Sequence, residues 1–308
     1  MKNILIIKHG SLGDIISSTS VFKDIKDHFK NDRIFILTTS KFKDFFLDSP
    51  FSNEIIIDDR EGVYKTIILL KKIVKLNINL VINLQNSNRT LIYDLIFRLF
   101  LSVEINGTGI FSTLRYKNIY ENLPPVIEGL SNQIEKLGIK TRRKPYLDWL
   151  EGENHHTSLL KNKNYFIINP GCSIKNQQKK WSKENFVVIC NFLISKNIFP
   201  ILIGADTDKD SIDYIFDNQK KSINLYNKSS LKVIFQLANN AIGALSNDTG
   251  PAHLIAASGC KLHLVLSSFS NFKTVIPQGK NITFTQKKSI NDITSNEVIE
   301  ILKMNYNL

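Results

Sequence analysis

Short apolar runs alternate with amphipathic segments along this chain, which is the pattern of a parallel α/β fold. In the segment 15–29, the apolar residues at 15, 22, 25 and 29 fall on one face of a helix. The strands predicted for the first half of the chain are 3–8, 33–38, 54–58, 80–84 and 103–106. Those predicted for the second half are 165–169, 199–203, a weak one at 223–225, 241–245 and 262–266. Further helices are predicted at 183–195, 208–217, 231–239, 251–258 and 294–303.

The two halves open in the same way, with a strand, a glycine-bearing turn and a helix. In the first half the turn is Gly10-Ser11-Leu12-Gly13, and in the second it is Asn169-Pro170-Gly171-Cys172-Ser173. This repetition predicts two Rossmann-like domains, residues 1–157 and 158–308, joined by the polar stretch 151–157. The last helix, 294–303, is a candidate to pack back on the first domain. Ligands of open α/β sheets gather at the carboxyl ends of the strands, so we expect a central cleft that the two domains face.

Charge adds one distinction between the halves. The chain carries 40 basic and 28 acidic residues, a formal net charge of +12. Residues 1–157 hold 22 basic and 18 acidic side chains, a surplus of 4, and residues 158–308 hold 18 and 10, a surplus of 8. Part of the lysine excess reflects a general bias, because Asn and Ile are also abundant. The rest suits a phosphorylated ligand or an anionic membrane surface. Nucleic acid is disfavoured, because the basic residues are scattered and form no recognition motif.

The cysteines and the apolar runs indicate the cellular compartment of the protein. The three cysteines are isolated, which fits a reducing environment. The N-terminal apolar run ends at Lys8, far too early for a signal peptide. The longest candidate for a membrane span, 91–105, is interrupted by charged residues. We therefore expect a cytoplasmic protein that is at most peripheral, on the cytoplasmic face of the inner membrane.

The most informative motif is Asn247-Asp248-Thr249-Gly250-Pro251-Ala252-His253, which follows a predicted buried strand. Asp248 or Thr249 can cap the next helix, Gly250 permits close backbone approach, and Pro251 suits a first helical turn. A helix N-terminus exposed in this way attracts anions, phosphate above all, and His253 could reach the same ligand. The alternative is an ordinary capped helix with an unrelated histidine.

A second motif is Lys8-His9-Gly10-Ser11-Leu12-Gly13-Asp14. Its two glycines allow a tight turn beside a ligand, so Gly10, Ser11 and Gly13 are candidates to line a ligand site. Asp14 begins the following helix and could act as a general base. Its alternative role is to stabilise the helix N-terminus. The motif is neither a Walker A sequence nor a full dinucleotide fingerprint.

Two further clusters in the second half have both a functional and an ordinary interpretation. Lys180, beside Lys179, could neutralise a diphosphate as a point charge, or the pair could be solvated, while Trp181 is expected to serve packing. Asp206 and Asp208 could hold a divalent metal, favour a helix start, or accept ribose hydroxyls. The pair His155-His156, in the expected linker, is predicted to be solvated.

Three segments together give the chain a resemblance to glycosyltransferase family 9, the heptosyltransferases of lipopolysaccharide inner-core assembly. They are the first strand with Gly10-Ser11-Leu12-Gly13-Asp14, then Asn169-Pro170-Gly171 leading to Lys180-Trp181, then Asn247-Asp248-Thr249-Gly250-Pro251 with His253-Leu254. Their order and spacing match along nearly the whole chain. The resemblance implies a GT-B architecture, with the acceptor bound mainly by the first domain and the nucleotide sugar by the second.

The resemblance also implies an inverting transfer that needs no metal or other cofactor. It assigns Asp14 as the base that takes the acceptor proton and Lys180 as the group that balances the diphosphate leaving group. Donor-binding residues would be Gly171, Cys172, Ser173, Lys180, Asp208, Asp248, Thr249, Gly250 and His253, beside the first-domain loop. The expected partners are an ADP-activated sugar, an anionic lipid-linked oligosaccharide acceptor and the inner membrane surface.

Two departures from the family pattern bear on the substrates. Asp208 falls where the family usually has a glutamate that contacts the nucleoside, and Ser267-Ser268 replaces a common Phe-Gly turn, which could alter the sugar contacts. Acceptor-binding residues are harder to transfer. The candidates are Arg60, Gln85, Arg89 and Arg115, which could meet phosphate or carboxylate groups or lie on an ordinary surface.

The leading hypothesis is therefore transfer of a heptose from ADP-heptose to an inner-core acceptor of lipopolysaccharide or lipooligosaccharide. A neighbouring hypothesis keeps the enzyme class but changes the nucleotide sugar or the surface-glycan acceptor. An NAD-dependent oxidoreductase is a distant alternative, because the first turn lacks the full glycine fingerprint. A nucleotide-sugar binding module without catalysis is disfavoured by the presence of both Asp14 and Lys180.

Overall fold

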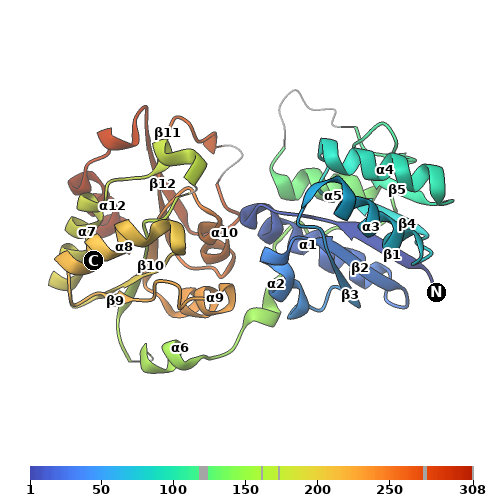
Figure 1. Ribbon diagram of the computed structural model, residues 1–308. Helices are drawn as coiled ribbons and strands as arrows, with labels where there is room; N and C mark the ends of the chain where they lie inside the picture. Colours follow the sequence, from blue (N-terminus) through green and yellow to red (C-terminus); the bar gives the residue numbers. More distant parts are fainter. Residues whose placement is uncertain (118–123, 161, 173, 273–275, 307–308) are drawn as a thin grey trace. The chain divides into compact units, whose positions relative to one another are not determined.

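The structure, a computed structural model, folds into two compact units, Met1–Trp149 and Leu150–Leu308 (Figure 1). It describes residues 1–117, 124–160, 162–172, 174–272 and 276–306. The division falls eight residues before the boundary predicted at 157. The reason is that the segment predicted as a linker packs against the second unit. There Asn154 donates a hydrogen bond to Gln236, and His155-His156 begin the short helix α6 (His155–Leu160), which contacts α9 (Leu231–Asn240).

The first unit is a six-stranded parallel sheet in the order β3-β2-β1-β4-β5-β6. Its strands are β1 (Asn3–Ile7), β2 (Arg33–Thr38), β3 (Glu54–Ile57), β4 (Leu80–Asn83), β5 (Glu104–Gly107) and β6 (Leu114–Arg115). Strand β1 lies at the centre, and its residues Ile4, Leu5, Ile6 and Ile7 are fully buried. Burying each of these side chains stabilises the fold by about 1.5–3 kcal/mol. An apolar run of this kind is expected for a parallel strand that is covered on both faces.

Helices connect the first five of these strands. They are α1 (Leu12–His28), the short η1 (Ser40–Phe42) and α2 (Lys43–Leu47), then α3 (Gly62–Val74) and α4 (Asn88–Phe100). After β6 come α5 (Val126–Glu135) and η2 (Asp148–Leu150). Helices α1 and α5 contact each other, and α3 contacts α4. The inner residues of α3 and α4 form one core cluster with alternate residues of the strands, among them Leu70, Phe97 and Ile105.

The second unit repeats this topology, with a six-stranded parallel sheet in the order β12-β11-β10-β7-β8-β9. Its strands are β7 (Tyr165–Asn169), β8 (Phe199–Leu202), β9 (Ile223–Asn224), β10 (Gly243–Asn247), β11 (Leu262–Ser267) and β12 (Ile282–Lys287). Its longer helices are α7 (Lys183–Ser195), α8 (Lys209–Asn218), α9, α10 (Gly250–Ala257) and α12 (Ser295–Tyr306). The 3-10 turns are η3 (Ile174–Lys179), η4 (Asp206–Asp208) and η5 (Ile290–Asp292). Counted within each unit, both sheets have the strand order 3-2-1-4-5-6, so the predicted pair of Rossmann-like domains is confirmed.

The elements differ from the prediction where packing overrides the local pattern. Strand β10 runs two residues later than 241–245, because pairing with β7 keeps Ser246 and Asn247 buried. Strand β12 and the two-residue β6 are unforeseen edge strands with little apolar alternation. Helix α12 buries Val298, Leu302 and Tyr306 in the core of the second unit.

This topology fixes where ligands are expected within each unit. In the order 3-2-1-4-5-6, the connections from the first and fourth strands leave in opposite directions and open a crevice between them. In the first unit that crevice lies beyond the ends of β1 and β4, and in the second beyond β7 and β10. We call these positions the first and second crevices.

Candidate active site

One buried amide side chain organises the second crevice. Asn247 ends β10, and its Nδ2 donates to the carbonyl oxygens of Pro170 (2.9 Å) and Gly171 (3.2 Å). Its Oδ1 accepts the backbone N–H of Trp181 at 3.2 Å. The loop after β7 and the start of the Trp181 segment are thereby fixed beside the end of β10. Since Asn247 is fully buried, each of these bonds is protected from water.

Helix α10 begins at this crevice without a side-chain cap. Thr249 is its N-cap residue, but the Thr249 Oγ1 accepts a hydrogen bond from Asn169 (2.8 Å). The Asp248 carboxylate points to other partners, the ammonium of Lys179 and the hydroxyl of Ser270, both at 2.7 Å. The expectation that Asp248 or Thr249 caps this helix is therefore wrong. The positive end of the helix dipole, at the first turn of α10, is therefore available to an anion.

The two lysines of the Lys179-Lys180 pair have separate roles. Lys179 is neutralised by Asp248, whereas the side chain of Lys180 makes no hydrogen bond or ion pair within the part of the chain that is described. Lys180 is half-buried, and its backbone N–H donates to Gln177 at 3.0 Å. Trp181 is 1% exposed, packs on Phe186 and donates its Nε1–H to the carbonyl of Ile293, which confirms the expected packing role.

Asp208 joins two loops at the edge of the second crevice. Its carboxylate accepts the backbone N–H groups of Cys172 (3.2 Å) and Ala205 (3.0 Å) and the Thr207 hydroxyl (3.2 Å). It packs so closely on Gly171 that a Cβ there would lie 2.6 Å from the carboxylate. The buried carboxylate therefore holds the loop after β7 against the loop after β8. Contact with a nucleoside stays a prediction for Asp208, and Ser173 lies outside the described residues.

The other donor candidates of this unit, Thr249, Gly250 and His253, lie at the start of α10, next to Asn169 and Asn247. Asp206, the other member of the suggested metal pair, accepts hydrogen bonds from Tyr226 (3.1 Å) and Asn227. Protein donors thus occupy both carboxylates of that pair. The structure gathers the second-unit candidates, with the exception of Asp206 and the undescribed Ser173, around a single helix start.

The first crevice is built from ionisable side chains. Lys8 and His9 follow β1 and are both buried. Lys8 Nζ donates to the carbonyl of Leu84 (3.4 Å), and the backbone N–H of His9 donates to Gln85 Oε1 (2.9 Å). Burial lowers the pKa of Lys8, and the nearby negative charge of Asp14 opposes that change. The loop after β1 is thereby tied to the loop after β4.

Asp14 lies in the first turn of α1, at the mouth of this crevice. Its Oδ2 accepts the backbone N–H of Ser11 at 3.1 Å, which is half of a capping box. The side chain is half-buried, and among the described residues its other oxygen has no hydrogen-bond donor. The two proposed roles of Asp14, helix stabilisation and proton acceptance, are therefore compatible. Gly10 adopts a φ of +132°, and a Cβ at that position would lie 2.8 Å from Phe42.

A buried ion cluster around Asp58 supports the first crevice, and sequence reasoning missed it. Asp58 Oδ2 accepts the Tyr93 hydroxyl (2.7 Å) and lies 3.2 Å from His9 Nε2, and Oδ1 accepts Arg89 (3.1 Å). Burial alone would raise the pKa of Asp58, but these neighbours outweigh it and hold the pKa well below its usual value. Burial and the bond to Asp58 raise the pKa of Tyr93 to about 12. The one feature of the sequence that could have pointed to Asp58 is its position at the end of a predicted strand.

The acceptor candidates are only partly brought together. Arg60 and Arg89 share Asp58, which accepts the backbone N–H of Arg60 at 3.1 Å. Gln85 is at the first crevice, whereas Arg115 lies on the edge strand β6, where its Nε donates to Thr108. Acceptor binding by all four stays a prediction.

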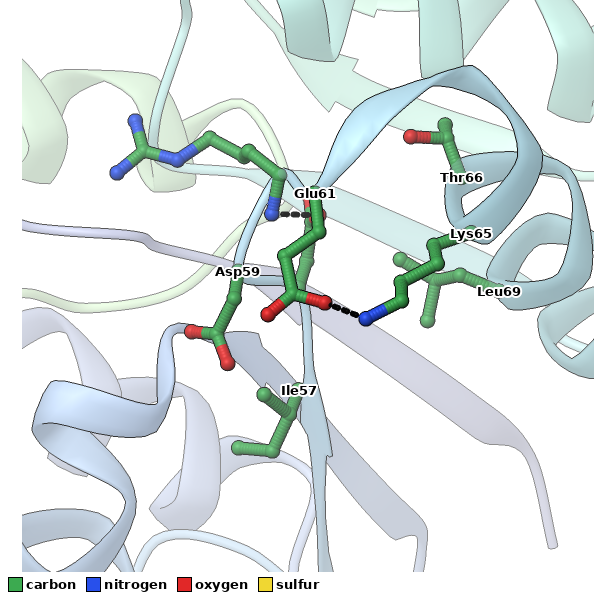
Figure 2. A pocket seen from close by; sticks show the side chains of 8 residues that line it. Ile57, Asp59, Glu61, Lys65, Thr66 and Leu69 are labelled. Atoms are coloured by element: carbon green, nitrogen blue, oxygen red, sulfur yellow. Dashed lines mark hydrogen bonds and ion pairs between the residues drawn. The ribbon is translucent and has the colours of Figure 1, made fainter.

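A pocket after β3 contains Arg60 (Figure 2). An ion pair between Glu61 and Lys65 spans it. Its lining mixes both signs of charge, with the carboxylates of Asp58, Asp59 and Glu61 beside Arg60 and Lys65. The pocket as it stands is therefore no simple anion site.

Comparison with known proteins accords with this arrangement. Residues 129–268 match the sequence profile of Glycosyltransferase family 9 (heptosyltransferase). The chain is 27% identical over 258 residues to lipooligosaccharide heptosyltransferase 2 of Campylobacter jejuni serotype O:2. This alignment covers 80% of this chain and 74% of that protein.

Two solved structures share the fold along almost the entire chain. A family 9 glycosyl transferase from Veillonella parvula has a TM-score of 0.83 at 17% identity, covering 99% of this chain and 97% of that one. The E. coli ADP-heptose LPS heptosyltransferase II has a TM-score of 0.80 at 18% identity, covering 100% and 99%. These likenesses confirm the GT-B fold with its two Rossmann-like domains, and the profile match confirms the resemblance that the three motifs carry.

Proposed function

We propose that this chain, which is similar to glycosyltransferases of family 9, transfers a heptose from ADP-heptose to an inner-core acceptor of lipopolysaccharide or lipooligosaccharide. The reaction would be an inverting displacement that uses no metal ion. The observation that carries the proposal is the second crevice, where the uncapped start of α10 lies beside residues that fix the loop leading to Lys180. Its acceptor would lie at the cytoplasmic face of the inner membrane, where the protein is a peripheral partner.

In this proposal the diphosphate of the donor lies at the start of α10. The Gly250 N–H and the positive end of the α10 dipole bind its oxygens, and the Lys180 ammonium balances the charge that develops as the bond to the sugar breaks. Lys179 cannot substitute, because Asp248 already neutralises it. A preorganised helix end of this kind needs no rearrangement at the moment of reaction, so its contribution is greatest in the transition state.

Asp14 supplies the base. Inversion at the anomeric carbon requires the acceptor hydroxyl to attack from the face opposite the departing diphosphate and to lose its proton as the new bond forms. The free oxygen of Asp14 can take that proton while Oδ2 keeps its hydrogen bond to Ser11. The bond to the Ser11 N–H fixes the orientation of the carboxylate, and the transfer depends on the acceptor being held at the first unit and the donor at the second.

Two structural features favour a reaction without a metal ion. Cationic and dipolar groups, Lys180 and the start of α10, are already placed where a divalent cation would otherwise offset the diphosphate charge. The carboxylates that the sequence offered as ligands, Asp206 and Asp208, accept hydrogen bonds from protein donors.

A different nucleotide sugar or surface-glycan acceptor is the second candidate function. It is favoured by the end of β11, where Ser267 is buried and the Ser268 hydroxyl donates to the carbonyl of Lys288 (3.0 Å). Serines here would give the sugar pocket a lining other than the Phe-Gly turn common in the family.

One experiment separates these candidates. Core oligosaccharide is isolated from a strain that lacks the gene. It is incubated with the purified protein and one nucleotide sugar at a time: ADP-heptose, ADP-glucose or a UDP-hexose. The masses of the products are then measured by mass spectrometry. The proposal expects one added heptose with ADP-heptose alone, and no product with the Asp14→Asn variant. Transfer only from a different nucleotide sugar would support the second candidate, and no transfer from any donor would contradict both.

A further inference from the structure

The outer faces of α3 and α4 are apolar where a surface helix is ordinarily charged. Their inner residues, among them Leu70 and Phe97, pack on the sheet of the first unit. A helix that covers a sheet in this way normally presents polar residues outward. Here the exposed side chains of α3 include four large apolar ones, Val63, Tyr64, Ile67 and Ile68.

Helix α4 continues this surface with the exposed side chains of Ile92, Leu99 and Phe100. The two helices contact each other and run side by side on the first unit (Figure 1). The exposure is extensive, since Tyr64 is 76% exposed and Phe100 is 70% exposed. We call these seven side chains the α3–α4 apolar face. Large apolar side chains gathered on two neighbouring helices mark a candidate interaction surface, whereas scattered ones need no explanation.

The charges on these two helices are mostly positive beyond the start of α3, where Glu61 pairs with Lys65. Helix α3 contains no acidic residue and ends in Lys71 and Lys72, followed by Lys75, all exposed. Helix α4 has an exposed Arg98, and its one acid, Asp94, is fully buried. The face therefore combines two aromatic and five aliphatic side chains with the exposed lysines at the end of α3. This is the composition of segments that lie in the interface of anionic bilayers.

We propose that the α3–α4 apolar face docks the protein on an anionic lipid bilayer. Tyr64, Ile68 and Leu99 enter the boundary between headgroups and acyl chains, and the lysines contact lipid phosphates while their alkyl stems cover apolar surface. The choice of a membrane as the occupant rests on the proposed function, because a lipid-linked acceptor is presented there. No helix among the described residues is long and apolar enough to cross a membrane, so the proposed contact is peripheral.

A second copy of the chain fits this face less well. A symmetric contact would apply the same surface to itself, so the lysines that end α3 in one copy would come close to cations of the other. Like charges in a desolvated interface oppose association, whereas anionic lipid neutralises the same groups.

The test is flotation of the full-length protein with vesicles. Purified protein is mixed with phosphatidylethanolamine–phosphatidylglycerol vesicles or with pure phosphatidylcholine vesicles. Two double variants test the apolar and the charged residues separately. One combines Ile68→Glu with Leu99→Glu, and the other combines Lys71→Glu with Lys75→Glu. The matched control is Leu159→Glu with Met304→Glu, which places the same substitutions at exposed apolar positions of the second unit.

The proposal expects the wild type and the control to float with anionic vesicles, and both face variants to lose binding by about tenfold or more. Binding should also fall at high salt and on phosphatidylcholine. Equal flotation of all the proteins would overturn it, as would a wild-type dimer that the Ile68→Glu, Leu99→Glu variant dissociates. Transfer to a delipidated core oligosaccharide is measured in parallel and should be unchanged in the face variants. Failure of the proposed function would appear there as no transfer even by the wild type, and the vesicle result would still be interpretable.

Discussion

The two crevices have the same topology but are lined by different kinds of side chain. In the first unit the crevice is surrounded by ionisable side chains, with Lys8, His9 and Asp58 buried near Asp14. In the second unit the amides of Asn169 and Asn247 hold the loops through hydrogen bonds, and Asp208 is the one buried carboxylate described among them. Topology therefore fixes the position of a site, and the residues placed there decide what it binds.

The helix starts show this difference most clearly. In the first unit α1 is closed by its own Asp14, and α4 is capped by Ser87, which accepts the N–H of Thr90. In the second unit α10, the counterpart of α4, has no side-chain cap, because its carboxylate is drawn to Lys179 and Ser270. An anion finds the uncapped, positive end of a helix dipole at α10, whereas the first unit offers a carboxylate that can take a proton.

The largest expected effect is on the carboxylate of the first crevice. Asp14→Asn should lower the transfer rate by about 10²–10⁴-fold, since the amide can still accept the Ser11 N–H but cannot take a proton. Initial rates of ADP release with acceptor present measure this. Asp27→Asn, at a partly exposed position near the other end of the same helix, is the control and should keep its rate. An Asp14→Asn enzyme within a few-fold of the wild type would remove Asp14 from its role as base.

The next effect distinguishes the two lysines of the second crevice. Lys180→Ala should reduce turnover by about 10²–10³-fold, because a charge aimed at the developing diphosphate is lost. Lys179→Ala should cost less, since that ammonium is already neutralised by Asp248. Steady-state kinetics of the two variants decide the matter, and a greater loss in Lys179→Ala would reverse the assignment.

Stability should reveal how the second crevice is held. Asn247→Leu leaves the N–H of Trp181 and the carbonyls of Pro170 and Gly171 without their partner, and each buried group left unpaired costs about 1–3 kcal/mol. Urea unfolding should show a lower free energy of unfolding. The exposed Asn240→Leu serves as the control, with a change within about 0.5 kcal/mol. Equal stability of the two variants would mean that Asn247 does not hold the crevice.

The last effect concerns a buried carboxyl of the first unit and appears only as a dependence of stability on pH. Burial raises the pKa of Asp94 to about 7, against the opposing hydrogen bond from Asn83 (2.8 Å). The folded state then binds this proton more tightly than the unfolded state, so stability should decline as pH rises from about 4 to 7, by at most about 1.4 kcal/mol per pH unit.

Asp94→Asn should remove that decline, as unfolding at several pH values would show. Asp58, whose pKa is held low, acts in the opposite sense and only under acidic conditions, because its stabilisation is lost as pH falls through the folded-state pKa. An unchanged pH profile in Asp94→Asn would contradict the assignment of the raised pKa to this group.

The sequence predicted what depends on local pattern and missed what depends on distant partners. The apolar runs placed ten of the strands, and the three motifs located both crevices. The internal role of Asp208 could not be foreseen, because its partner Cys172 is 36 residues away. The Asp58 cluster likewise joins the ends of β1 and β3 to α4 through Tyr93, a residue that resembles any core aromatic in the sequence.

The most direct test of the division between the two crevices is ADP binding by titration calorimetry to the wild type, Asp14→Asn and Lys180→Ala. The account predicts the wild-type dissociation constant for Asp14→Asn and an affinity about tenfold or more weaker for Lys180→Ala, because the diphosphate is held by the second unit. Unchanged binding by Lys180→Ala together with weakened binding by Asp14→Asn would contradict it.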